Sequence, residues 1–247
     1  MQRPLDAVLF DLDDTLHDDT LAYQSAAEEV ALEVAAEHGI EAATLKAAYI
    51  AQAEGFWKQL SPEAFATKLA NVRARLWHAA LSSVGVEDEG LASRSARRYN
   101  DYRKKRYLLF PGAIELLRDL RAAGKQLGIV TNGLSETHRE KIALLQLEKR
   151  VDAVFIADEV GMIKPDPRLF THACASLGVP PARSAMVGDR YDRDVVGAAE
   201  AGLFTIYLKV RDEVLPEGCT PPDATCTSIE EVSGVLLGNL GPSRSVS

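Results

Sequence analysis

The sequence contains few cysteines and no arrangement of them typical of a disulfide framework or a metal site. Its three cysteines are widely spaced, with no Cys-x-x-Cys pair and no Cys/His ligand pattern. An odd, sparse count is typical of free thiols in a reducing compartment. A chain of 247 residues buries roughly 70–75% of its unfolded surface on folding. It therefore needs neither disulfides nor a structural metal for stability.

Long apolar runs and an excess of basic residues are also missing. No run approaches the ~20 residues needed to span a bilayer, and Met1-Gln2-Arg3-Pro4 precedes the first strand without the apolar region of a signal peptide. The net charge of −8 argues against a nucleic-acid polymer as partner, because such binding needs a basic surface. A small phosphorylated substrate in a local positive pocket is not excluded. We expect a cytoplasmic protein, monomeric or homodimeric, that binds no membrane.

Apolar runs alternate with helical patterns from residue 111 onward. Helices are expected at about 112–123, 136–147, 167–177, 192–201 and 228–238, and strands at 126–130, 153–156, 184–187, 203–208 and 224–226. Asp166-Pro167 is a typical helix start, and Gly124 and Gly178 stand where helices should end. This alternation predicts an α/β fold, a doubly wound (Rossmann-like) parallel sheet with helices on both faces.

A long helical segment interrupts this pattern after the first strand. A connection from strand to helix is usually about 2–6 residues, so the segment 18–107 is predicted to be an inserted all-helical domain. Its first helix repeats apolar residues at helical spacing: Tyr23, Ala27, Val30 and Val34. Further helices are expected over about 61–80 and 90–106. The core domain would then comprise residues 1–17 and 108–240, followed by a disordered tail at 241–247.

Two carboxylates follow the first strand directly. Asp11 and Asp13 come at the end of the apolar run Ala7–Phe10, and parallel α/β sheets bind ligands beyond the carboxyl ends of their strands. Like charges this close raise the energy of each other's ionised form. A divalent cation, a shared proton or a solvated turn would each relieve that repulsion.

Three further polar motifs follow later apolar runs. They are Thr131-Asn132-Gly133, then Lys164 before a Pro-Asp-Pro sequence, and finally Gly188-Asp189 with Asp194. In this order, the carboxylate pair, the hydroxyl, the lysine and the second carboxylate group resemble the four motifs of the haloacid dehalogenase-like (HAD) hydrolase superfamily. The resemblance covers most of the chain outside the helical insert, and it implies that the insert is a cap domain over the active site.

The resemblance implies a role for each motif. Asp11 would be the nucleophile that forms an aspartyl-phosphate, and Asp13 the general acid and base. The Thr131 hydroxyl, the Asn132 backbone amide and the Lys164 ammonium would bind the phosphoryl oxygens, because phosphoryl transfer depends on such electrostatic contacts.

The implied cofactor is Mg²⁺. It would be held by the Asp11 carboxylate, the Asp13 backbone carbonyl and Asp189, since Mg²⁺ prefers oxygen ligands. Asp194 would support these ligands without binding the metal itself. His17, next to the first motif, is a possible substrate contact.

The expected activity is Mg²⁺-dependent hydrolysis of a small-molecule phosphomonoester. The Thr-Asn-Gly sequence at 131–133, the Gly-Met-Ile-Lys-Pro-Asp sequence at 161–166 and the helical insert most resemble a branch that contains pyrimidine 5′-nucleotidases and N-acylneuraminate-9-phosphatase, followed by phosphoglycolate phosphatase-like proteins. This resemblance implies a nucleoside monophosphate, a sugar phosphate or a phosphoglycolate-like compound as the substrate. Haloacid dehalogenases lack an aspartate at the position of Asp13, because a halide leaving group needs no proton. A dehalogenase or phosphomutase on the same scaffold is the alternative, and a non-catalytic binding module is a remote one.

Overall fold

The chain forms two compact units, each described here by itself. The computed structural model describes residues 4–58, 71–210, 215 and 218–238. The core unit consists of Met1–Asp18 and Leu109–Ser247, and the helical unit of Asp19–Leu108. Both junctions lie one residue later than the boundaries expected from the sequence. The predicted disordered tail at 241–247 lies outside the described residues.

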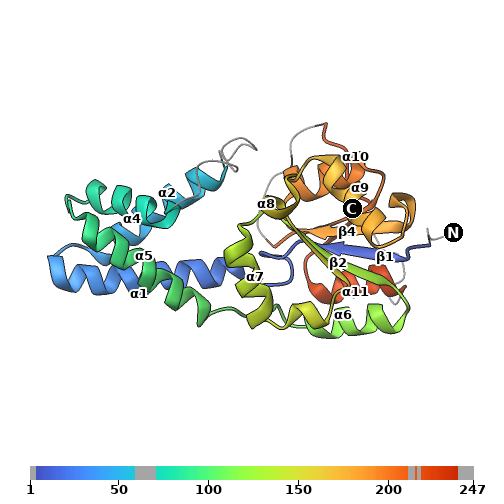
Figure 1. Ribbon diagram of the computed structural model, residues 1–247, viewed down its shortest axis with the longest axis horizontal. Coiled ribbons are helices and arrows are strands. Elements are labelled where there is room, and N and C mark those ends of the chain that lie inside the picture. Colours follow the sequence, from blue (N-terminus) through green and yellow to red (C-terminus); the bar gives the residue numbers. More distant parts are fainter. Residues whose placement is uncertain (1–3, 59–70, 211–214, 216–217, 239–247) are drawn as a thin grey trace, which may run out of the picture. The chain divides into compact units, whose positions relative to one another are not determined.

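A parallel sheet forms the centre of the core unit (Figure 1). In the described residues its strands are β1 (Ala7–Phe10), β2 (Gln126–Thr131), β3 (Ala153–Ile156), β4 (Ser184–Gly188), β5 (Phe204–Leu208) and β6 (Ala224–Cys226). Their order is β3-β2-β1-β4-β5-β6, and β1 pairs in parallel with both β2 and β4. The strand order therefore reverses beside β1, which is where sheets of this kind bind ligands. The predicted doubly wound parallel sheet is confirmed.

Helices pack on both faces of this sheet. They are α6 (Ala113–Ala122), α7 (Ser135–Leu144), α8 (Ala157–Val160), α9 (Pro167–Ser176), α10 (Val196–Glu200) and α11 (Ile229–Leu237). Side chains alternate along a strand, so β1 contributes to two separate cores. Val8 and Phe10 pack in the core that includes α6 and α11, whereas Leu9 packs in the core that includes α9 and α10. Because side chains on both faces of β1 are buried, the strand is held in place, and so is the direction in which the chain continues after Phe10.

The expected helix at 192–201 differs in its first turn. Residues Tyr191–Val195 form a π-helical turn, and the α-helix α10 starts only at Val196. In this wider turn the Asp194 carboxylate accepts a hydrogen bond from the Arg190 backbone amide at 3.0 Å. Asp194 is fully buried as a result. Such turns are frequent at functional sites, and the apolar pattern of the segment gave no sign of it.

The helical unit contains α1 (Asp19–His38), α2 (Ala42–Lys58), α4 (Val72–Ser83) and α5 (Glu89–Lys104) in the described part of the chain. Its core is built around three aromatic rings: Tyr49 stacks on Trp77 with ring centroids 4.0 Å apart, and Tyr99 packs against both. The prediction of one helix through 61–80 is wrong, because Asn71 adopts a left-handed conformation with φ 54° and α4 begins after it. The part of that prediction before residue 71 lies outside the described residues.

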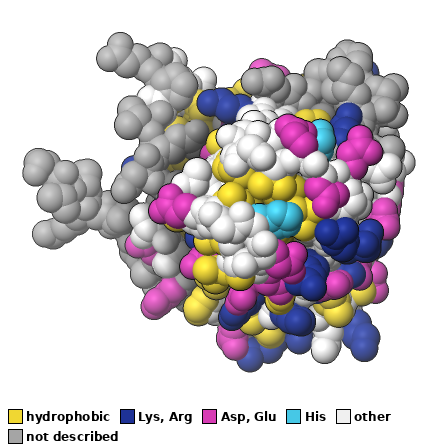
Figure 2. Space-filling view, turned by 90° about the vertical axis from the view of Figure 1, so that its left-hand side faces the viewer, with side chains coloured by type: hydrophobic (Ala, Val, Ile, Leu, Met, Phe, Trp, Pro, Cys, Tyr) yellow, Lys and Arg dark blue, Asp and Glu magenta, His cyan; other side chains and the backbone are white. Residues whose placement is uncertain are grey.

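Ion pairs join the first and last helices of the helical unit. Arg103 donates to both carboxylate oxygens of Asp19, at 2.5 and 2.8 Å, and Arg98 pairs with Glu33. Figure 2 shows acidic and basic side chains interspersed among apolar ones on the face that it presents. Two of the basic residues of α5, Arg98 and Arg103, are thus paired with acids on α1. Within the described residues, no helix has the length and apolar character required to cross a membrane.

Two glycine-to-alanine substitutions should change stability in opposite directions. A Cβ at Gly197 in α10 would lie 2.3 Å from the Pro165 carbonyl oxygen, whereas a Cβ at Gly55 in α2 would meet no atom within 4 Å. We expect Gly197→Ala to lower the free energy of unfolding by about 1–3 kcal/mol through overpacking. Gly55→Ala should raise it by about 0.5–1 kcal/mol through helix propensity.

Urea unfolding measured by circular dichroism and by tryptophan fluorescence tests this pair. Both tryptophans of the chain, Trp57 and Trp77, lie in the helical unit, so fluorescence follows that unit and circular dichroism follows both. A Gly197→Ala protein as stable as the wild type would contradict the close approach of α10 to the Pro165 carbonyl.

Candidate active site

A tight turn after β1 presents the first pair of carboxylates. The Asp11 amide donates to the Val187 carbonyl at 2.9 Å, which extends the pairing of β1 with β4 by one residue. The Leu12 carbonyl then accepts from the Leu16 and His17 amides, both at 3.0 Å. These bonds close a turn directly after the strand. They hold Asp11 at the carboxyl end of β1, which is the place where the strand order of the sheet reverses.

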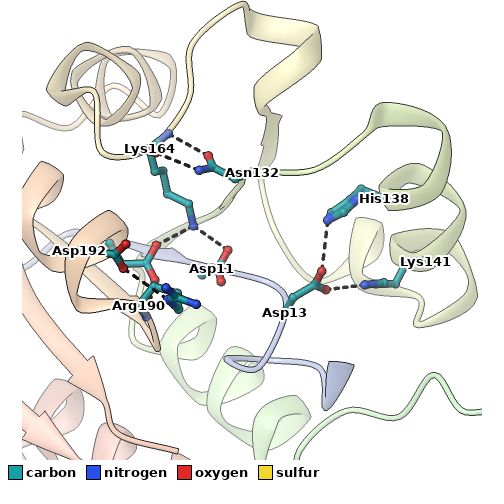
Figure 3. Close-up of polar contacts among 9 residues, drawn as sticks. Asp11, Asp13, Asn132, His138, Lys141, Lys164, Arg190 and Asp192 are labelled. Carbon is teal, nitrogen blue, oxygen red and sulfur yellow. Dashed lines mark hydrogen bonds and ion pairs between the residues drawn. The ribbon is translucent and has the colours of Figure 1, made fainter. Parts of the chain in front are cut away.

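Lys164 is the buried cation beside Asp11. Its Nζ donates to Asp11 Oδ1 at 2.7 Å and to Asp194 Oδ1 at 2.6 Å, and the residue is only 4% exposed. The Asn132 side chain fixes the Lys164 backbone with two bonds: Asn132 Nδ2 donates to the Lys164 carbonyl at 2.9 Å, and the Lys164 amide donates to Asn132 Oδ1 at 2.8 Å (Figure 3). Sequence reasoning missed this role of the Asn132 side chain, and the predicted phosphate contact of its backbone amide stays a prediction.

Three buried carboxylates meet at this place. Asp11, Asp189 and Asp194 each offer one oxygen, and these oxygens lie within 4.8 Å of one another. A Cβ at Gly188 would lie 2.2 Å from Asp194 Oδ2, so the glycine at the end of β4 makes room for this carboxylate. The sequence motif of Gly188, Asp189 and Asp194 therefore corresponds to one packed arrangement.

The cluster holds more negative charge than its lysine balances. Burial raises the pKa of Asp11 to about 6, with Lys164 opposing the shift and Asp194 adding to it. Burial, followed by the charges of Asp11 and Asp194, raises the pKa of Asp189 to about 9. Burial alone would lower the pKa of Lys164, but the two carboxylates that it contacts raise it above its ordinary value. A further positive charge would stabilise the ionised form of this site.

The donor chemistry of the cluster fits a hard divalent cation. Carboxylate oxygens without histidine or cysteine suit Mg²⁺, Mn²⁺ or Ca²⁺ rather than zinc. Asp11, Asp189 and Asp194 together could hold such an ion. The predicted metal ligands Asp11 and Asp189 belong to this cluster. The carbonyl of Asp13 as a third ligand stays a prediction, and so does the supporting role of Asp194.

Asp13 is held by a different set of groups. Its side chain turns toward α7, where Lys141 Nζ donates to Asp13 Oδ1 at 2.5 Å and His138 Nε2 lies 3.3 Å from Asp13 Oδ2 (Figure 3). Lys141 is fully buried and His138 nearly so. Sequence reasoning missed both residues. A signal was present, because His138, Lys141 and Ile142 share the inner face of the helix at i, i+3 and i+4 spacing.

The remaining predicted site residues lie near the same strand ends. Thr131 is the last residue of β2 and is 2% exposed. The His17 side chain is fully buried, and its backbone forms bridges with Asp13 and Leu109. Phosphate binding by Thr131 and substrate contact by His17 stay predictions. Asp192 is exposed and pairs with Arg190 at 3.3 Å.

The parallel sheet places a cluster of carboxylates and lysines where α/β enzymes bind their ligands, and comparison with known proteins identifies the family. A family model described as haloacid dehalogenase-like hydrolase matches residues 5–202. Glyceraldehyde 3-phosphate phosphatase of Methanothermobacter thermautotrophicus is 31% identical over 204 residues, which cover 83% of this chain and 85% of that one. N-acylneuraminate-9-phosphatase of Mus musculus is 30% identical over 240 residues, 93% of each chain. The chain therefore belongs to the haloacid dehalogenase-like hydrolase family.

A solved structure has the same fold. The HAD-hydrolase YfnB of Bacillus subtilis, crystallised bound to magnesium, superimposes with a TM-score of 0.73 at 24% identity, over 94% of this chain and 99% of that one. At this identity the likeness shows the fold alone. The four-motif resemblance found in the sequence is confirmed by the family match.

The acidic cluster predicts how stability depends on pH and metal. An acid whose pKa is raised in the folded protein destabilises that protein increasingly as pH rises above its ordinary pKa, until it is fully ionised. Without a divalent cation, the melting temperature should therefore fall from about pH 4, the ordinary pKa of an aspartate, to about pH 9, the pKa of Asp189. Asp11 contributes up to its pKa of about 6, so the fall between pH 6 and pH 9 comes from Asp189. Added Mg²⁺ should raise the melting temperature, more at pH 9 than at pH 6, because protons no longer compete.

Thermal unfolding of the wild type and of Asp189→Asn, each with EDTA or Mg²⁺ at both pH values, measures this dependence. The asparagine variant removes one titrating carboxylate, so its melting temperature should change less with pH and respond less to Mg²⁺. Asp192→Asn, at an exposed carboxylate, is the matched control and should behave as the wild type. An equal Mg²⁺ response in wild type and Asp189→Asn would remove Asp189 from the metal site.

Proposed function

We propose that this protein is a Mg²⁺-dependent phosphatase that hydrolyses a small-molecule phosphomonoester through an aspartyl-phosphate on Asp11. The observation that carries the proposal is the buried Asp11 carboxylate at the reversal of the strand order, paired with Lys164 and close to Asp189. The names of the relatives support it, because both similar enzymes are phosphatases. A pKa of about 6 leaves Asp11 mostly ionised at neutral pH, as a nucleophile must be.

The first step transfers the phosphoryl group to the enzyme. A carboxylate oxygen of Asp11 bonds to phosphorus while the bond from phosphorus to the substrate oxygen breaks. Asp13 gives a proton to the departing oxygen, which leaves as an alcohol. Lys164 and the Thr131 hydroxyl bind the phosphoryl oxygens, whose charge they stabilise. Mg²⁺, held by Asp11, Asp189 and the Asp13 carbonyl, would neutralise part of the same charge when bound.

The second step releases inorganic phosphate. Asp13, now ionised, takes a proton from a water molecule as the water oxygen bonds to phosphorus. The bond between phosphorus and the Asp11 oxygen breaks, and this returns Asp11 to its carboxylate form. Asp13 is protonated again and ready for the next turnover, so one residue serves both steps. The presence of Asp13 favours this reaction over dehalogenation, in which the leaving halide needs no proton.

The motif residues do not distinguish one phosphomonoester from another, so a different part of the chain must select the substrate. Asp11, Asp13 and Lys164 would act only on the phosphoryl group and its ester oxygen, which every phosphomonoester shares. We infer that the helical unit, residues 19–108, selects the rest of the substrate. The two relatives are named for a triose phosphate and a sugar-acid phosphate, so sugar phosphates are the first candidates. Nucleoside monophosphates and phosphoglycolate-like compounds follow.

Replacement of the nucleophile gives the sharpest test of the activity. Asp11→Asn should lower the release of inorganic phosphate from every active substrate by at least about 10⁴-fold, because loss of a nucleophile removes the covalent route. The measurement is phosphate release across a panel of sugar phosphates, nucleoside monophosphates and phosphoglycolate, with Mg²⁺ and with EDTA. Asp192→Asn, at an exposed carboxylate between Asp189 and Asp194, is the control and should keep wild-type rates.

Three results would contradict the proposal. The first is no phosphate release from any member of the panel by the wild type. The second is full activity in Asp11→Asn, which would move the nucleophile elsewhere. The third is activity in EDTA equal to that in Mg²⁺, which would remove the metal from the reaction.

A further inference from the structure

The buried ammonium of Lys141 lies against the acid/base residue from a helix that no motif includes. Lys141 is fully buried, and removal of an ammonium from water is unfavourable unless the charge is paired. Its Nζ donates to Asp13 Oδ1 at 2.5 Å. The Asp13 side chain is 27% exposed, so solvent reaches it while the buried Lys141 contacts it from the interior.

His138 contacts the other oxygen of the same carboxylate, and the sequence makes room for it. Its Nε2 lies 3.3 Å from Asp13 Oδ2. A Cβ at Gly133 would lie 2.0 to 2.2 Å from three atoms of the imidazole. Any other residue at 133 would displace the ring, so the glycine after Thr131 and Asn132 allows His138 to lie against the end of β2. Lys141 and His138 thus lie against the two oxygens of the Asp13 carboxylate from the same helix.

Helix α7, which carries both residues, is itself fixed to α8. The Ser135 amide donates one bifurcated hydrogen bond to both oxygens of the Asp158 carboxylate, at 2.9 and 2.8 Å, and Asp158 so caps the start of α7. One turn later, Arg139 forms a two-bond ion pair with Glu159, at 2.9 and 2.5 Å. Lys141 and His138 are thus presented by an anchored element rather than by a loop.

We propose that Lys141 and His138 are positioning residues that fix the Asp13 carboxyl group toward the leaving-group oxygen. An acid must lie within hydrogen-bond reach of the atom that it protonates. A free aspartate side chain samples several rotamers, and two contacts on its two oxygens select one of them. The inference rests on the proposed phosphatase activity and deepens it, because it assigns the orientation of the acid/base to α7.

The test uses the leaving group as a probe of acid catalysis. Lys141→Met keeps the length and apolar character of the side chain but removes the ammonium. The value of kcat/KM reports steps up to departure of the alcohol, and an alkoxide needs a proton far more than p-nitrophenolate does. Loss of positioning should lower kcat/KM for the best alkyl phosphate of the panel by about 10²-fold, and much less for p-nitrophenyl phosphate. His138→Ala should shift the same ratio in the same direction.

Controls separate positioning from loss of structure. Ile142→Ala, the next residue of α7 and fully buried in the core, loosens the helix without removal of a contact to Asp13. It should lower stability while the alkyl-to-aryl ratio of kcat/KM stays at the wild-type value. Lys141→Arg retains the positive charge and should recover part of the ratio lost in Lys141→Met. If Lys141→Met fails to fold, His138→Ala gives the same measurement.

Each outcome is decisive. An alkyl-to-aryl ratio that falls in Lys141→Met or His138→Ala, but not in Ile142→Ala, supports the inference. An active wild type whose ratio is unchanged in folded Lys141→Met and His138→Ala overturns the inference and leaves the proposed function intact. Equal falls in Ile142→Ala and Lys141→Met also overturn it, because the effect would then come from helix packing. A wild type inactive on every phosphomonoester would overturn both.

Discussion

The ammonium group of Lys164 lies between the carboxylates of Asp11 and Asp194, in a place from which water is largely excluded. Loss of one partner of a buried ion pair typically costs about 3–5 kcal/mol, because the other charge is left uncompensated. Several neighbouring features serve to keep this lysine in place. Asn132 bonds both polar groups of its backbone, Gly197 lets α10 approach the following Pro165 carbonyl, and the π-helical turn brings Asp194 inward.

The turn after β1 holds two carboxylates two residues apart, and the structure gives each its own lysine. Asp11 pairs with Lys164, and Asp13 pairs with Lys141 from α7. The repulsion expected from their proximity is therefore relieved by two separate cations, in addition to any divalent ion. The two aspartates are thereby held by different elements: Lys141 comes from α7, and Lys164 comes from the segment between α8 and α9.

Much of the fold could be predicted because its signals are local. Apolar runs, the N-cap Asp166 before Pro167 and the glycines at helix ends mark strands and helices without knowledge of the partners. The first, second and fourth motifs could be located because each directly follows a strand, whereas Lys164 follows the short helix α8. Lys141 and the Asn132 side chain could not be assigned in this way, since their roles depend on residues more than 30 positions away in the sequence. The break at Asn71 was missed because asparagine only sometimes adopts a left-handed conformation.

The central claim is that Asp11 carries the phosphoryl group during turnover. It is tested most directly by acid quench of an Asp13→Asn variant after mixing with p-nitrophenyl phosphate and Mg²⁺, followed by peptide mass spectrometry. This leaving group departs without a proton, whereas release of phosphate from the enzyme needs the base, so the intermediate should accumulate. The account predicts one phosphoryl group on the peptide that contains Asp11. A modification on a different residue, or product formation with no covalent adduct at any quench time, would contradict it.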